Sequence, residues 1–152
     1  MQKSFTFKLE PVRALREQVE KQAQEALAHE LELERRHQAD VAEAAQRVEL
    51  ARAAGVPDEG TAVTGRDLLA HQAYVERVER EKAVAEEGLA VQERQVDAGR
   101  SRLVEASREH EVLVRLKQRR RIEHDQELAR AQGAALDEIA ITRHLRRSLE
   151  AA

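Results

Sequence analysis

Apolar side chains recur every three or four residues over most of the chain, as expected for helices that pack along one face. In the second half, positions alternating by three and four form a heptad stripe: Val75, Val78, Lys82, Ala85, Leu89, Gln92, Val96, Gly99, Leu103, Ala106, His110 and Leu113. A similar stripe in the first half contains Val12, Leu15, Val19, Ala23, Leu27, Leu31, Val41, Ala45 and Val48. Polar members dilute both stripes. The two stripes predict two long helices that pair as a coiled coil.

A single break separates the two stripes. Gly55, Pro57 and Gly60 fall within six residues; Gly55 suits the left-handed position that ends a helix, and Pro57 follows where the helix cannot continue. Thr64 is then a candidate N-cap, with Asp67 at the acidic position of a capping box. These cues predict that one helix ends just before Gly55 and that the next begins just after Thr64.

The expected fold class is all-α. We predict a first helix over about 10–54, a loop over about 55–64 and a longer second helix over about 65–149, in a single coiled-coil domain spanning 1–152. Because a short loop joins two long helices, they should run antiparallel as a hairpin.

The unequal helix lengths leave part of the second helix unpaired. At about 1.5 Å per residue the helices measure roughly 65 Å and roughly 125 Å, so the first should cover the second only to about Ser107 or Leu113. The stretch beyond still carries large apolar residues: Leu116, Ile122, Leu128, Leu136, Ile139, Ile141 and Leu145. A lone helix gains little stability from propensity, so we expect another molecule to hold this stretch.

Composition supports long helices over a globular core. Charged residues make up 36% of the chain and aromatic residues 2%, whereas a compact core of this size would bury several aromatic rings. The formal net charge of -3 is too low for the alternative reading of a charge-rich disordered chain. There is no cysteine, no apolar run of about 20 residues and no signal-like apolar N-terminus. A soluble cytoplasmic location is expected.

Signatures of enzymatic chemistry are missing from the sequence. It contains no G-x-x-x-x-G-K-[ST], G-x-G-x-x-G or G-x-S-x-G motif. His110 and Glu111 begin like a zinc-protease helix, but Val114 stands where the second histidine would be needed. We therefore expect no enzyme activity, no metal or cofactor and no small-molecule substrate.

The one concentrated basic stretch is residues 115–121, with the sequence RLKQRRR. It is either a solvated helix face or a docking surface for an acidic protein, where complementary charge would favour encounter and orientation. Nucleic acid is disfavoured, because no aromatic residue interrupts the stretch, acidic residues follow it and the whole chain is acidic.

Short motifs at both ends and after the break resemble one family. The opening Phe5-Thr6-Phe7-Lys8-Leu9, followed by Val12, Leu15, Arg16 and Glu17, resembles the F-x-F-x-L start of the FliJ family of flagellar type III export proteins. Arg13 is a departure, because Leu is usual there. The run Leu136-Asp137-Glu138-Ile139-Ala140 resembles the closing element of that family. Tyr74, within Gln72–Val75, is similar to the aromatic residue that begins its second helix.

The resemblance implies a cytoplasmic stalk-like coiled coil of the export apparatus, associated peripherally with the inner membrane. Implied partners are the hexameric export ATPase, the cytoplasmic domain of the export-gate membrane protein and export chaperones, which the family helps to recycle. The resemblance and the basic stretch suggest these ATPase-binding residues: Phe5, Phe7, Arg115, Lys117, Arg119, Arg120, Arg121, Asp137 and Glu138. Suggested gate-binding residues are Val41, Ala45, Val48, Tyr74 and Val78, although seam packing explains Val78 equally well.

Two alternative classes remain at this point. One is a structural coiled-coil scaffold, which would explain the periodicity but not the F-x-F-x-L opening. The other is the equivalent stalk protein of a virulence-type secretion system or of a rotary ATPase.

Overall fold

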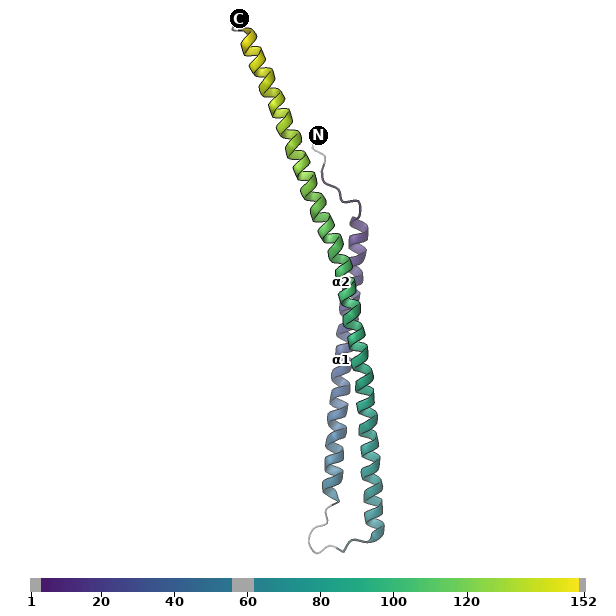
Figure 1. Cartoon of the computed structure of the whole chain (residues 1–152). Coiled ribbons are helices and arrows are strands. Elements are labelled where there is room, and N and C mark those ends of the chain that lie inside the picture. The colour runs from purple at the N-terminus through teal and green to yellow at the C-terminus, as the bar shows by residue number, and fades with distance from the viewer. Residues whose placement is uncertain (1–3, 56–61, 151–152) are drawn as a thin grey trace. The chain divides into compact units, whose positions relative to one another are not determined.

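The computed structural model describes residues 4–55 and 62–150, which form two helices and no strand (Figure 1). Helix α1 runs from Glu10 to Ala54 and α2 from Gly65 to Glu150. The observed helix limits agree with the expected ones to within one residue. Of the expected loop, the part from 56 to 61 lies outside the described residues. The fold class is confirmed: α1 and the longer α2 pack against each other as an antiparallel coiled-coil hairpin.

The end of α1 differs from its prediction in one respect. Gly55 N–H donates to the Arg52 carbonyl at 3.3 Å, a tightened last turn, but its φ is not in the left-handed region. Glycine instead leaves room there for a neighbouring side chain. A methyl group on its Cα would collide with the imidazole of His71, which approaches from the start of α2.

The start of α2 is a reciprocal capping box, as predicted. The Asp67 N–H donates to Thr64 Oγ1 at 3.2 Å, and the Thr64 N–H donates to Asp67 Oδ2 at 3.0 Å. These hydrogen bonds satisfy backbone donors that a helix N-terminus otherwise leaves unpaired. They also lower the pKa of Asp67 below its usual value, because the carboxylate accepts from both the hydroxyl and the backbone of Thr64.

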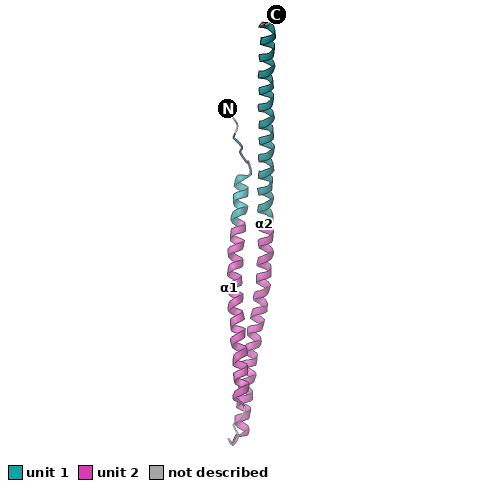
Figure 2. Ribbon diagram, turned by 90° about the vertical axis from the view of Figure 1, so that its left-hand side faces the viewer, with its two compact units in different colours: residues 1–18, 107–152 teal, residues 19–106 magenta. Residues whose placement is uncertain are grey.

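The chain divides into two compact units (Figure 2). Unit 1 comprises residues 1–18 and 107–152, and unit 2 comprises residues 19–106. Both helices contribute to both units.

In unit 2 the helices meet through an apolar seam. Val48, Ala51 and Val78 form a buried cluster, against which Val75 packs. Further along, Leu27 lies over Gly99, where an added methyl group would come within 3.3 Å of Leu27 Cδ1. The predicted α2 seam is confirmed, since every predicted position from Val75 to Leu113 is buried or half-buried.

One buried polar contact interrupts this seam. The Gln92 side chain is only 8% exposed, and its Nε2 donates to the Glu30 carbonyl at 3.0 Å and to Glu30 Oε2 at 2.6 Å. A buried amide has to keep its partners, because leaving it unpaired costs free energy. The pair therefore favours this register of α1 against α2.

In unit 1 the face of α1 that meets α2 is charged, and here the predicted stripe is wrong. Val12 and Leu15 are 42% and 58% exposed, whereas the neighbouring Arg13 side chain is 21% exposed. Polar groups on α2 explain the difference: Lys117 forms an ion pair with Glu10 at 2.8 Å, and Glu109 one with Arg16 at 2.6 Å. Charged residues on α1 form ion pairs with these groups of α2, and the apolar residues of this part of α1 face solvent.

Candidate protein-binding surfaces

The non-helical residues before α1 lie along α2 in unit 1. The Phe5 ring contacts the His124 ring, with centroids 5.7 Å apart and planes inclined by 59°. Phe5 and Phe7 are both half-buried. The covered part of α2 thus extends beyond the expected limit at Leu113, and several positions as far as Leu128 are half-buried. The reason is that the non-helical residues continue along α2 beyond the N-terminal end of α1.

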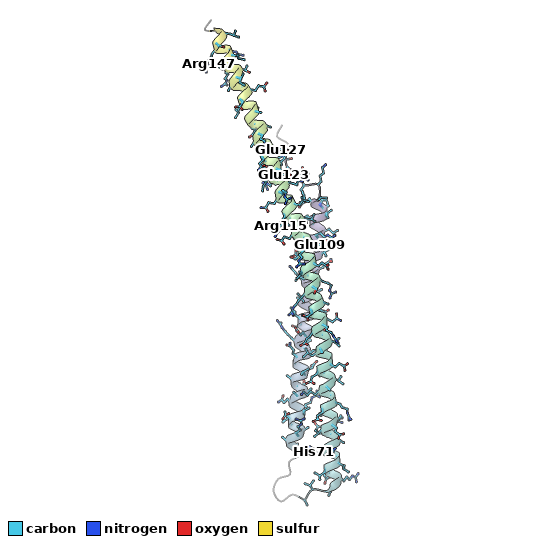
Figure 3. All side chains as sticks on the ribbon, in the orientation of Figure 1. His71, Glu109, Arg115, Glu123, Glu127 and Arg147 are labelled. Atoms are coloured by element: carbon cyan, nitrogen blue, oxygen red, sulfur yellow. The ribbon has the colours of Figure 1, made fainter. Side chains whose placement is uncertain are left out.

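A cavity of about 580 Å³ lies between these residues and α2, and we call it the terminal cavity. Its walls combine apolar and charged side chains: Phe5, Thr6, Phe7, Lys8, Leu9, Leu116, Arg120, Glu123, His124 and Glu127. Figure 3 labels Glu109, Glu123 and Glu127 along this part of α2. Three predicted ATPase-binding residues from opposite ends of the sequence, Phe5, Phe7 and Arg120, therefore share one site.

A network of ion pairs holds the adjoining turn of α1. Arg13 donates to Glu10 Oε1 from Nη2 at 2.7 Å and from Nε at 3.0 Å, while Lys117 Nζ contacts Glu10 Oε2 at 2.8 Å. Hydrogen bonds from Arg13, and then from Lys117, lower the pKa of Glu10 to about 2 from an ordinary 4.5. Glu10 therefore stays ionised at neutral pH and links the two helices.

The basic stretch 115–121 is only partly neutralised within the chain. Arg115 pairs with Glu111, Lys117 with Glu10, and Arg120 with Glu123. Arg119 and Arg121 are exposed, and neither forms an ion pair within the described residues. Two fixed positive charges therefore remain available on the surface beside the terminal cavity.

Residues 129–149 of α2, here called the α2 extension, are exposed at every position. Figure 3 labels Arg147 at this end of α2, where no other described segment of unit 1 lies beside it. Large apolar residues are exposed along it, namely Leu136, Ile139, Ile141, Leu145 and Leu149. The predicted contact residues Asp137 and Glu138 belong to this segment. Among the described residues, neither forms an ion pair.

The five suggested gate-binding residues all lie in unit 2, but their exposure differs. Val48 and Val78 are each 3% exposed and belong to the core cluster, so their side chains serve intramolecular packing. Val41 and Ala45 are half-buried. Tyr74 is 43% exposed, and the Arg77 guanidinium lies 5.2 Å from its ring centroid. Tyr74 is the member of the set with the most side chain free for a partner.

Sequence reasoning missed the residues that complete the terminal cavity, above all Leu116, Glu123, His124 and Glu127. The predicted loop does not by itself locate them. If facing residue numbers in an antiparallel hairpin have a constant sum, a loop at 55–64 places Phe5 opposite about residue 114, well short of His124.

No stretch of either described helix is apolar enough to cross a membrane. The described residues contain no group of three or more His, Cys, Asp or Glu that could hold a metal ion.

The fold and its surfaces define a class: a two-helix coiled coil whose exposed features are suited to binding other proteins. The family model described as "Flagellar FliJ protein" matches residues 5–149, nearly the whole chain. The chain belongs to the FliJ family, as the sequence resemblance indicated. Membership makes it a component of flagellar type III export, in a family of non-catalytic export proteins. A comparison with curated proteins finds no significant match, and neither does a comparison with solved structures.

Proposed function

We propose that this chain binds the hexameric flagellar export ATPase as a central-stalk-like coiled coil and connects it to the export gate. It has no hydrolase activity of its own and assists the recycling of export chaperones. The ATPase-facing surface consists of the terminal cavity, the basic stretch and the α2 extension, all in unit 1. The gate-facing surface lies in unit 2 around Tyr74. Through these contacts the protein associates peripherally with the inner membrane.

The observation that carries the proposal is the exposed α2 extension. Twenty-one consecutive helical residues, 129–149, are exposed while carrying five large apolar side chains. A helix that packs against nothing is only marginally stable in water, and exposed apolar side chains in such number mark an interaction site. Arg143, Arg146 and Arg147 add positive charge to the same segment, which favours an acidic partner surface.

Family membership favours the flagellar assignment over the two alternatives raised by the sequence, a structural scaffold or the stalk of another secretion or rotary system.

The proposal is tested by titrating the purified chain into the cognate export ATPase at fixed nucleotide. We expect a larger hexamer fraction by light scattering and faster ATP hydrolysis, with no hydrolysis by the chain alone. No change in either oligomer size or turnover would contradict the stalk role.

Two sets of substitutions separate the surfaces. Replacing Arg115, Arg119, Arg120 and Arg121 together with Glu should weaken ATPase binding while helix content is retained, and the loss should be larger at low salt. Tyr74→Ala should spare the ATPase and weaken binding to the gate protein's cytoplasmic domain, because a half-exposed Tyr offers a partner apolar area and a polar tip. The opposite pattern would mean that the two surfaces are assigned to the wrong partners.

A further inference from the structure

We infer that the terminal cavity is a binding site for an acidic peptide segment of a partner protein that inserts one bulky apolar side chain. This goes beyond the proposed function, which names the partner but not the chemistry of the segment that it contributes. It rests on the proposed function only for the identity of the natural partner.

The terminal cavity is large enough to admit such a side chain. At about 580 Å³ it lies within the roughly 300–1,000 Å³ range of pockets that bury small ligands. Four apolar residues from two segments line it: Phe5, Phe7, Leu9 and Leu116. Phe5 and Phe7 are the only phenylalanines in the chain, and both contribute to this one site although aromatic residues make up just 2% of the sequence.

The charges around the cavity specify the neighbours of that apolar side chain. Lys8 lines the cavity and forms no ion pair within the described residues. Arg119 and Arg121 lie in the adjoining turn of α2, outside the cavity lining, and they also form no ion pair within the described residues. Arg120 is already paired with Glu123. Among the lining residues Lys8 and Glu127 carry opposite unpaired charges, so the positive surplus comes from Arg119 and Arg121 in the adjoining turn. Carboxylates that flank the inserted side chain on that side would meet complementary charge.

Glu127 determines on which side of the cavity the acidic flank of the partner segment can lie. Glu127 lines the cavity and has no ion-pair partner among the described residues. It would repel a carboxylate placed next to it. The acidic flank of the partner segment should therefore lie toward Lys8 and Arg119, with the apolar side chain between that flank and Glu127.

The contacts that form the cavity wall allow a partner to enter. The wall residues 5–9 lie outside both helices, and backbone hydrogen bonds join them to α1 from Glu10 N–H to Phe7 O at 3.1 Å and from Arg13 N–H to Leu9 O at 2.9 Å. The Phe5 ring contacts the His124 ring, with centroids 5.7 Å apart. A segment held in this way can adjust to an inserted side chain without disturbing either helix.

The probe for the test is a blocked, fluorescein-labelled peptide with carboxylates on one side only, Glu-Glu-Leu-Trp-Ser-Ser, titrated into the 152-residue protein at low salt with no ATPase present. We expect saturable binding by anisotropy, and amide chemical-shift changes confined to residues 5–9 and 116–127. A peptide with Ser-Ser in place of Leu-Trp, and one with Lys in place of every Glu, should each bind at least about tenfold more weakly, a factor that corresponds to about 1.4 kcal/mol.

Matched variants distinguish the cavity from general charge. Lys8→Glu should weaken binding about fivefold or more, whereas Arg130→Glu, the same charge change at an α2 position that does not line the cavity, should have less than a twofold effect. Glu127→Gln should strengthen binding. Leu116→Ala should weaken it, and Ile122→Ala, at an exposed α2 position outside the cavity, should not.

Binding that is unchanged by Lys8→Glu and Leu116→Ala, or shift changes elsewhere in the chain, would overturn the inference. So would the absence of binding at millimolar peptide while circular dichroism shows an intact helical protein. Because the titration contains no ATPase, a protein that fails to bind the ATPase yet binds the peptide would contradict the proposed function alone.

Discussion

The two units use the same pair of helices but hold them together by different forces. In unit 2 the seam is apolar, with Val48, Val78 and Val96 each no more than 3% exposed. In unit 1 the corresponding face of α1 is charged, and ion pairs such as Glu10–Lys117 connect the helices while Val12 and Leu15 face solvent. Apolar burial supplies stability, whereas exposed ion pairs contribute little and weaken with salt. Apolar burial therefore stabilises unit 2, whereas unit 1 leaves both apolar and charged side chains exposed.

The largest expected effect comes from placing a charge in each seam. Val96→Asp should lower the free energy of unfolding by at least about 3 kcal/mol, because an unpaired carboxylate would be buried. Val12→Asp, at a position where the sequence pattern predicted burial, should change it by less than about 0.5 kcal/mol. Urea unfolding followed by circular dichroism measures both. If Val12→Asp proves as damaging as Val96→Asp, the charged face of unit 1 is misassigned.

A smaller effect is expected at the polar contact in the apolar seam. Gln92→Ala should cost about 1–2 kcal/mol, because it removes the two hydrogen bonds to Glu30 from a buried site. Gln95→Ala, at an exposed position nearby on the same helix, is the control and should be nearly neutral. Equal effects of the two substitutions would mean that the buried amide has no special role in unit 2.

Acid should loosen unit 1 before it affects unit 2. The folded-state pKa of Glu10, about 2, lies below its ordinary 4.5, so ionised Glu10 stabilises the contact with α2. That contribution is complete above pH 4.5 and is lost as the pH falls from 4.5 toward 2. Fluorophenylalanine at Phe5 and Phe7 would report the loosening by fluorine NMR. Glu10→Gln should abolish this pH dependence, and a wild-type spectrum that stays constant down to pH 2 would contradict it.

Salt should produce the smallest change. Raising sodium chloride from 0.05 to 1 M shortens the screening length from above 10 Å to about 3 Å and weakens the exposed pair of Arg16 and Glu109. The same fluorine signals should shift slightly, while the urea midpoint of unit 2 is not lowered. A lowered midpoint would indicate that ion pairs, such as Arg52 with Glu79, contribute more to unit 2 than its apolar seam does.

The sequence predicted the parts of the fold that depend on local chemistry. The Thr64–Asp67 cap and the break at Gly55 set the helix limits, and period-3.5 spacing identified the α2 seam through Leu113. It failed for the first turns of α1, because apolar spacing at Val12 and Leu15 does not reveal which charged groups α2 presents. There the pairing of Glu10 with Lys117, a long-range contact, decided which face turned inward.

Only part of the candidate site could be predicted from the sequence. Phe5, Phe7 and the basic stretch were identified from the family-like opening and from charge. Their meeting in one cavity depends on the register of the hairpin, which the stripes alone leave uncertain by a heptad. Gly55 is a second example: its position was predicted from helix-ending chemistry, but the side chain that lies against it, His71, belongs to the other helix.

The antiparallel connection also sets an order for folding. His71 meets Gly55 across one short loop, whereas Phe5 and His124 are separated in sequence by most of the chain. Closing a longer loop costs more chain entropy, so contacts next to the turn should form first and pairing should propagate away from it. The contact between Phe5 and α2 comes last, and on the ribosome it waits until α2 has been synthesised. The partner-binding cavity is therefore present only in chains whose folding is complete.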